Sequence, residues 1–258
     1  MSKRGAIIAV SAALLIGFVA LVIHNYKTKT SFKYAEKTAQ ELKPEQNPQD
    51  AVTAEVNKEA KEDAITEARR DSELLKVLPE DFVLGDKAAP VLLIEYASLS
   101  CPHCADFARE AFEKLKSEYV DSGKIKFVFR NFPLNQPALV AAMFAECQAN
   151  DNKDRAGEKY FSTLKALFKT QDTWAFDEKF SEKLEAIAQL DGMSSDRFKK
   201  CISDKSLQEK ILTSRMEASK SLQLRSTPSF FINGEISEGF VDYKSLKKLI
   251  DAKLSEKK

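Results

Sequence analysis

Hydrophobic and polar positions divide the chain into three regions. An uncharged apolar run covers Ala6–Ile23, a charged stretch follows it, and strand and helix periods begin near Leu78. A helix of 18 residues is about 27 Å long, close to the roughly 30 Å hydrocarbon core of a bilayer. The pattern predicts an N-terminal transmembrane helix (1–26), a charged linker (27–77) and a folded domain (78–258).

The apolar run has two possible fates. A signal peptide usually ends at a small-x-small cleavage site, whereas this run ends "ALVIHNYK". We therefore favour an uncleaved signal anchor over a cleaved signal peptide. Lys3 and Arg4 precede the run and Lys27 and Lys29 follow it, so basic residues alone do not decide its orientation.

Lys, Glu, Ala and Gln dominate the linker, in which Pro44 and Pro48 precede a segment with helical character. The apolar positions of this segment form a thin stripe: Val52, Val56, Ala60, Ile65, Ala68, Leu75 and Leu78. Such a stripe suits either a solvated, partly helical spacer or a weakly oligomerising stalk.

A strand–helix–strand unit opens the folded region. "PVLLIEYA" (90–97) is a short apolar run typical of a buried strand, and "KIKFVFR" (124–130) alternates as a second strand. Between them, apolar residues recur every three or four positions: Phe107, Ala111, Phe112, Leu115 and Tyr119. Two cysteines, Cys101 and Cys104, therefore lie where the first strand passes into the helix.

Helical periodicity then continues from about 137 to 222 and predicts four to six helices. "SFFI" (229–232), an Asn-Gly turn and "EISE" (235–238) return to a β-hairpin pattern, and an amphipathic helix from Tyr243 to Leu254 follows. The expected architecture is an α/β domain interrupted by a large helical insertion.

The amino-acid composition limits the kinds of partner and of catalytic centre that the chain can have. Hydrophobic residues make up 43% and charged residues 31%, and 40 basic side chains balance 39 acidic ones, so nothing indicates a nucleic-acid partner. His24 and His103 are the two histidines, which excludes a histidine-rich metal centre. The candidate chemistry therefore belongs to the cysteines.

Cys101 has the features of a reactive thiol. Pro102 suits the first position of a helix, which places Cys101 at the N-terminus, where unpaired N–H groups and the helix dipole stabilise a thiolate. His103 adds a donor or cation beside it, and Cys104 is expected to be the buried resolving thiol. A metal clip would need a second CxxC or more histidines, so we favour a redox pair.

Two further positions support this interpretation. Glu95 is the one carboxylate in the apolar strand, and burial would raise its pKa and make it a proton carrier for Cys104. The alternative is a carboxylate that points to water at the strand end. Thr227-Pro228 directly precedes a strand, and a cis bond there would bring this loop beside the cysteines.

Glu95, "CPHC", "FRNFPL" (129–134), the helical insertion and "STPSFFING" together resemble the DsbA-like branch of the thioredoxin superfamily. The resemblance implies a thioredoxin fold, a mixed disulfide formed by Cys101 and resolved by Cys104, a cis Pro228 and no cofactor. This family works outside the cytoplasm, so we expect a single-pass inner-membrane protein whose catalytic domain lies in the periplasm.

Cys147 and Cys201 both fall in predicted helices of the insertion. In an oxidising compartment they are expected to form a structural disulfide, as in some DsbA relatives. Two buried, unpaired thiols are the alternative.

The expected function is a membrane-anchored periplasmic oxidase. It would donate the Cys101–Cys104 disulfide to exported proteins and be reoxidised by a membrane partner of DsbB or quinone-reductase type. Thr227, where the best-known oxidases carry valine, resembles the isomerase branch, so an isomerase or reductase oligomerised by the stalk stays open. A non-enzymatic chaperone or binding module is the third hypothesis.

Overall fold

The structure, a computed structural model, describes residues 72–238 and 242–256. The predicted transmembrane helix and most of the predicted linker lie outside the described residues. Within the two described ranges, no helix combines the length and apolar character needed to cross a bilayer.

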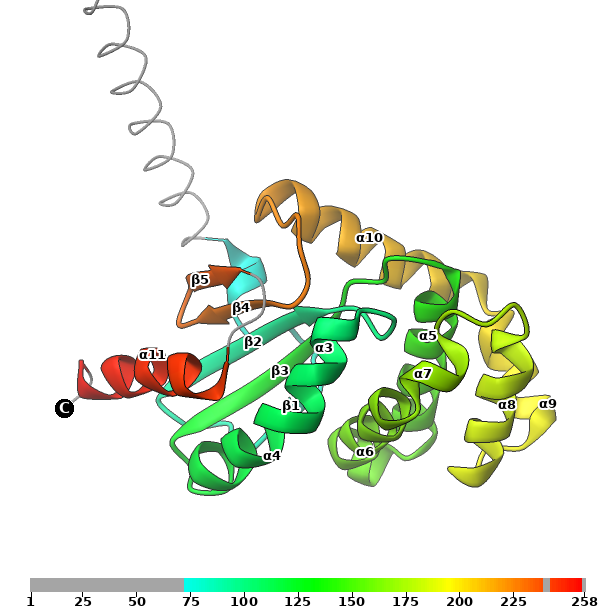
Figure 1. Ribbon diagram of the computed structural model, residues 1–258, viewed down its shortest axis with the longest axis horizontal. Coiled ribbons are helices and arrows are strands. Elements are labelled where there is room, and N and C mark those ends of the chain that lie inside the picture. The colour runs from blue at the N-terminus through cyan, green and yellow to red at the C-terminus, as the bar shows by residue number, and fades with distance from the viewer. Residues whose placement is uncertain (1–71, 239–241, 257–258) are drawn as a thin grey trace, which may run out of the picture. The chain divides into compact units, whose positions relative to one another are not determined.

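Five strands form one mixed sheet in the order β1-β3-β2-β4-β5 within the described part of the chain (Figure 1). In sequence order they are β1 (Val83–Leu84), β2 (Val91–Ala97), β3 (Ile125–Asn131), β4 (Ser229–Ile232) and β5 (Glu235–Glu238). The central strand β2 pairs in parallel with β3 and antiparallel with β4, and β5 pairs with β4 as the predicted hairpin. Strand β1, with two residues, is too short to have been predicted from a pattern.

The predicted strand–helix–strand unit is confirmed. One continuous helical segment joins β2 to β3 and consists of α3 (Pro102–Asp106), the π-helical η2 (Phe107–Ala111), α4 (Phe112–Leu115) and the π-helical η3 (Lys116–Val120). It starts directly after Cys101, so the cysteine pair lies at the carboxyl end of the central strand.

The helical insertion between β3 and β4 contains six α-helices, all within the described residues 72–238. They are α5 (Gln136–Asp151), α6 (Ala156–Lys169), α7 (Gln171–Trp174), α8 (Phe180–Leu190), α9 (Ser195–Ile202) and α10 (Lys205–Ser221), with the short η4 (Lys153–Arg155) before α6. Figure 1 shows α5 to α9 gathered beside the sheet and α10 returning the chain to it.

Alternation along β2 sends side chains to two different cores. Leu93 and Ala97 join the core under the active-site helix, whereas Ile94 and Tyr96 join a second core with Leu222 from the end of the insertion. Because successive strand residues point to opposite faces, Glu95 faces the same side as Leu93 and Ala97. The strand period therefore places this carboxyl under the helix that carries the cysteines.

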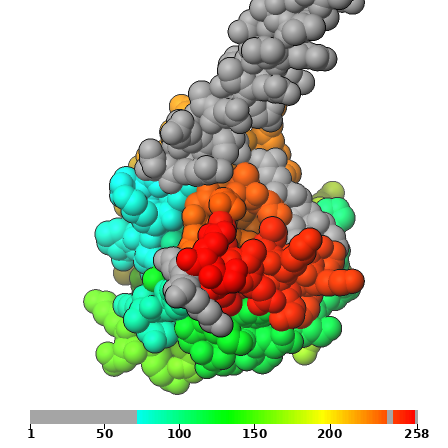
Figure 2. Space-filling model, turned by 90° about the vertical axis from the view of Figure 1, so that its left-hand side faces the viewer, coloured from blue at the N-terminus to red at the C-terminus, as the bar shows by residue number. Residues whose placement is uncertain are grey.

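The C-terminal helix α11 (Tyr243–Ser255) closes the same face of the sheet. It buries Leu246 and Ile250 in the core of the active-site helix. Figure 2 shows the red surface of α11 directly beside the green surface of the active-site helix.

Packing begins slightly earlier than the predicted boundary at 78. The 3₁₀ turn η1 (Glu73–Leu75) buries Leu75 against the second face of the sheet. Arg130 on β3 donates to the carbonyl oxygens of Leu74 and Lys76 and to both carboxylate oxygens of Asp81. Long-range contacts of this kind leave no local pattern in the sequence.

Candidate active site

Cys101 is the N-cap residue of α3, as its position before Pro102 predicts. Its backbone is extended, with φ −80° and ψ 122°, and its residue surface is 6% exposed. The Cys101 N–H donates to the carbonyl of Ser98, so a tight turn carries the chain from β2 into the helix. The sulfur consequently faces the open end of the helix, where backbone N–H groups lack intrahelical partners.

The surroundings of Cys101 lower its pKa from 9.0 to about 5. The largest cause is a hydrogen bond from the Cys104 thiol, which stabilises the Cys101 thiolate against the opposing cost of desolvation. The Thr227 side chain and the backbone N–H groups of Cys104 and His103 add smaller contributions. At neutral pH the free Cys101 is therefore a thiolate.

Cys104 has the opposite environment. It is fully buried in the first turn of the helix, and burial raises its pKa well above the usual range of a thiol, with the hydrogen bond to Cys101 and the charge of Glu95 acting in the same direction. Both residues are free cysteines in the structure. The pair is thus strongly asymmetric, with one stabilised thiolate and one protonated thiol that serves as its donor.

Glu95 is buried, with 3% of its surface exposed, and does not point to water. Burial raises the pKa of its carboxyl, and the negative charge of Cys101 raises it further. Among the described residues no hydrogen-bond partner reaches its Oε1. The alternative of a solvated strand-end carboxylate is therefore wrong, and burial beside the thiols favours the protonated form of this carboxyl.

The Thr227-Pro228 peptide bond is cis, as expected, and its loop lies beside the cysteines. In its protonated form the Cys101 thiol donates to the Thr227 carbonyl at 3.3 Å, although the two residues are 126 positions apart in sequence. The Thr227-Pro228 loop therefore contacts the reactive sulfur directly.

Pro102 and His103 are exposed at the start of the helix. The His103 ring lies with Nδ1 3.8 Å from the Asp106 carboxylate, and its side chain is 67% exposed. The contribution of His103 to the pKa of Cys101 comes from its backbone N–H. The His103 ring therefore lies at the surface beside the nucleophile.

Gln171, in the first turn of α7, is a residue that the sequence did not single out. Its side-chain amide is buried and donates to the carbonyls of Leu99 (2.8 Å) and Cys101 (3.0 Å). These hydrogen bonds connect the insertion to the turn that presents the nucleophile. No local pattern reports a contact between residues 70 positions apart.

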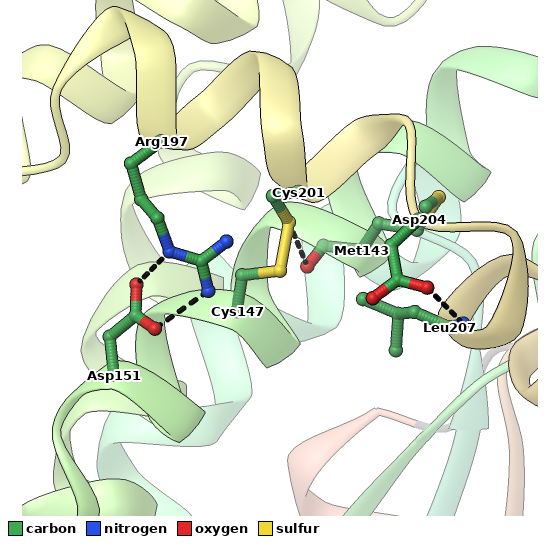
Figure 3. The surroundings of a disulfide bond; sticks show 7 residues. All are labelled: Met143, Cys147, Asp151, Arg197, Cys201, Asp204 and Leu207. Carbon is green, nitrogen blue, oxygen red and sulfur yellow. Dashed lines mark hydrogen bonds and ion pairs between the residues drawn. A yellow bond between two sulfur atoms is a disulfide. The ribbon is translucent and has the colours of Figure 1, made fainter.

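Cys147 on α5 and Cys201 on α9 form a disulfide with a Cα–Cα distance of 6.2 Å, which confirms the predicted pairing (Figure 3). Two hydrogen bonds of 2.6 Å between the Arg197 guanidinium and the Asp151 carboxylate join the same two helices. This second pair therefore fastens one helix of the insertion to another.

Within the described ranges, no group of three or more His, Cys, Asp or Glu residues is arranged to hold a metal ion. What the site can do chemically is exchange thiols with disulfides, since a thiolate, a protonated partner thiol and a buried acid lie together.

A family model described as thioredoxin matches residues 76–252. The chain belongs to the thioredoxin family. A Rickettsia conorii protein, named by inference as a protein-disulfide oxidoreductase, is 32% identical over 213 residues, which cover 82% of this chain and 73% of the relative. Disulfide bond formation protein D of Bacillus subtilis is 25% identical over 189 residues, covering 68% and 78% of the two chains.

Solved structures place this thioredoxin-family chain in the DsbA-like branch. The crystal structure of Wolbachia pipientis alpha-DsbA1 is similar with a TM-score of 0.66 and 37% identity, covering 71% of this chain and 96% of that one. A protein-disulfide isomerase from Novosphingobium aromaticivorans matches with a TM-score of 0.58 and 26% identity, covering 69% and 99%. The DsbA-like protein is a thiol:disulfide oxidoreductase.

Proposed function

We propose that this DsbA-like protein is a disulfide oxidase that donates the Cys101–Cys104 disulfide to exported proteins. The observation that carries the proposal is the set of hydrogen bonds on the Cys101 sulfur, which lowers its pKa to about 5. Stabilising the Cys101 thiolate stabilises the reduced pair, so the oxidised pair is more readily reduced and becomes a stronger oxidant. Each pKa unit corresponds to about 1.36 kcal/mol in favour of the anion.

Disulfide donation takes two exchange steps. A client thiolate attacks Cys101 Sγ, the Cys101–Cys104 bond breaks, and the electron pair leaves on Cys104, which takes up a proton. A second client thiolate then attacks the client sulfur of the mixed disulfide, and Cys101 leaves as a thiolate. The client loses two electrons and gains a disulfide, while the protein ends with one thiolate and one thiol.

Glu95 is the proposed proton source for Cys104 in the first step. Its carboxyl is buried on the same face of the sheet as the thiols, burial raises its pKa and so favours its protonated form, and its ionised form would raise the pKa of Cys104. A protonated acid can give its proton to the departing sulfur without leaving a thiolate in an apolar site.

The Thr227-Pro228 loop is the proposed docking edge for the client. The Thr227 carbonyl accepts from the Cys101 thiol when that thiol is protonated. In the mixed disulfide the Cys101 sulfur carries no proton, so this carbonyl is available for a client backbone N–H. An extended client segment would then bind by main-chain hydrogen bonding and with little sequence preference.

The proposed location is the periplasmic side of the inner membrane. The apolar run Ala6–Ile23 would anchor the chain, and the charged residues after it would hold the domain off the bilayer. The Cys147–Cys201 disulfide is consistent with an oxidising compartment. Because each cycle leaves the pair reduced, a membrane partner of DsbB or quinone-reductase type must accept the two electrons.

An isomerase or reductase is the second candidate. Thr227 precedes the cis-proline, as in the isomerase branch, and the similarity to the Novosphingobium isomerase agrees with it. Such an enzyme requires a pair that is kept reduced in cells.

The test is the equilibrium reduction potential of Cys101–Cys104, measured with the full chain in lipid nanodiscs against glutathione buffers. We expect a value far above that of thioredoxin, which is about −270 mV. A potential at or below the thioredoxin value would contradict the oxidase and favour a reductase. The ratio of reduced to oxidised pair in cells provides a second check, since the oxidase accumulates in the oxidised form.

A further inference from the structure

A cavity of about 290 Å³ lies behind the active-site helix, on the face of the sheet where Glu95 is buried. The helical segment Phe107–Glu113, strand β3 and helix α6 enclose it. Six phenylalanines dominate its apolar lining: Phe107, Phe112, Phe127, Phe129, Phe161 and Phe168. The cavity is therefore a mostly aromatic chamber that reaches from the surface to the acid next to the thiols.

Four charged side chains line the solvent end of the cavity, Arg109, Glu113, Lys165 and Lys169, and the first three have partners. Lys165 pairs with Glu113 at 2.6 Å, and both side chains are more than half exposed. Arg109 donates to the Phe168 carbonyl and to the exposed Asp172. These groups consequently leave the entrance polar without supplying a polar group to the buried end.

The buried end of the cavity contains one unsatisfied polar atom. Glu95 Oε1 is solvent-inaccessible and has no hydrogen-bond partner in the described part of the chain, while the residue lines the cavity. A buried polar atom without a partner loses the free energy of a hydrogen bond. An occupant that donates to this oxygen would recover that free energy.

Size and polarity decide which occupant fits best. Cavities lined by apolar side chains stay dry at about 150 Å³ and accept benzene, whereas a buried water needs two to four polar partners. This cavity has nearly twice that volume, with Glu95 as the polar side chain at its buried end. An aromatic molecule of two fused rings with one N–H or O–H donor matches the chamber better than a chain of waters.

We propose that the cavity is a binding site for a small, neutral, planar aromatic molecule that places a single N–H or O–H donor on Glu95 Oε1. The rings pack against the phenylalanine side chains, and the entrance ion pair of Lys165 and Glu113 closes over them. The site is separate from the docking edge of the client, because it approaches Glu95 from behind the helix. The assignment does not depend on the direction of the thiol chemistry.

The test uses 5-fluoroindole as the probe and 5-fluoro-1-methylindole as its matched control, which lacks the N–H. Each is titrated into the full chain in lipid nanodiscs and followed by ¹⁹F NMR, with empty nanodiscs to subtract partitioning into lipid. We expect saturable binding of 5-fluoroindole and at least tenfold weaker binding of the methylated probe. Equal binding of the two probes, or no saturable binding of either, would overturn the proposal.

Two matched variants locate the site. Ala108→Leu fills the cavity from the active-site helix, whereas Ala252→Leu makes the same change at an exposed position of α11. Ala108→Leu should weaken 5-fluoroindole binding at least tenfold, and Ala252→Leu should leave it unchanged. Unchanged binding to Ala108→Leu would place the probe elsewhere and overturn the assignment. The two-probe comparison on the unmodified chain stands even if Ala108→Leu fails to fold, and the reduction potential tests the oxidase separately.

Discussion

The two cysteine pairs are almost equally buried, yet their environments prepare them for opposite roles. Cys101 and Cys104 are 6% and 0% exposed, and Cys147 and Cys201 are 5% and 1% exposed. The first pair lies at a helix N-terminus with donors directed at one sulfur and a buried acid nearby. The second lies between helices, where Cys201 Sγ is 3.2 Å from the Met143 carbonyl oxygen (Figure 3). Reactivity here follows from the donors around a sulfur and not from its exposure.

The largest expected difference between the pairs is in disulfide transfer. Cys101→Ser should reduce the rate at which the oxidised protein oxidises an unfolded, reduced client by about 10³-fold or more, because the attacked sulfur is lost. The double variant Cys147→Ser/Cys201→Ser should keep the rate within about tenfold of the unmodified protein. Client oxidation measured by thiol titration checks both, and comparable losses in the two variants would remove the distinction.

For the free energy of unfolding, we expect the Cys147–Cys201 pair to matter more than the Cys101–Cys104 pair. The Cys147–Cys201 bond joins residues 54 apart, which corresponds to about 4 kcal/mol of unfolding free energy in the chain-entropy model. Its replacement by two serines should lower the stability by about this amount in denaturant titrations of the full chain. A loss below about 1 kcal/mol would mean that the Arg197–Asp151 pair and helix packing hold the insertion without the bond.

Glu95→Gln should slow client oxidation on the order of 10²-fold at neutral pH, since the amide cannot give a proton to Cys104. The amide keeps the size of the side chain, so the fold and the Cys101–Cys104 spacing should be preserved. Stopped-flow rates between pH 5 and 8, with thermal melting as the control, would separate a proton-transfer role from a packing role. A rate that falls equally at every pH, together with a lower melting temperature, would contradict the proton role.

The pH dependence of Cys101 alkylation and of stability in the reduced protein tests the difference in pKa between the two thiols of the reactive pair. Alkylation of Cys101 should be constant above pH 6 and fall about tenfold per pH unit below a midpoint of about 5. Because the folded pKa is below the unfolded value, the unfolded chain binds more protons between the two, and the Cys101 contribution to stability rises with pH from about 5 towards 9.

Comparing the stability of the reduced protein with that of the Cys101→Ser variant at each pH isolates the contribution of Cys101. Glu95 is present in both proteins, and its raised pKa changes stability with pH in the opposite direction. A stability difference that is independent of pH between 5 and 8 would contradict a thiolate at Cys101.

The smallest expected effect concerns the link between the insertion and the active site. Gln171→Met keeps the size of the side chain but removes both donors to the turn at Leu99 and Cys101. A typical hydrogen bond contributes about 1 kcal/mol, so the pKa of Cys101 should rise by less than about one unit. Thiolate absorbance at 240 nm measures the shift, and an unchanged pKa would show that Gln171 supports only the packing of α7.

Much of this site could be predicted because its residues are adjacent in sequence. Pro102 after Cys101 indicates a helix N-terminus, and a single carboxylate in an apolar strand indicates a buried acid. Patterns of neighbouring residues also predicted the strand ends, the Asn-Gly hairpin turn and the helical insertion.

Two contacts between distant segments were predicted, namely the Cys147–Cys201 disulfide and the position of the Thr227-Pro228 loop beside the cysteines. The amide of Gln171 on the nucleophile turn and the cavity behind the helix also join segments from different parts of the chain, and these could not be predicted. Their geometry depends on how the insertion packs against the sheet, and a glutamine or a phenylalanine has no local pattern that reports such packing.

The hydrogen bonds of Arg130 also have a mechanical consequence. This side chain, buried on the inner strand β3, holds the backbone of Leu74 and Lys76 and the carboxylate of Asp81. A pulling force applied to the chain ahead of Ser72 would therefore be transmitted to the centre of the sheet. The Arg130 guanidinium also donates to the Tyr96 hydroxyl on β2, so part of that force would reach the strand whose carboxyl end carries the nucleophile turn.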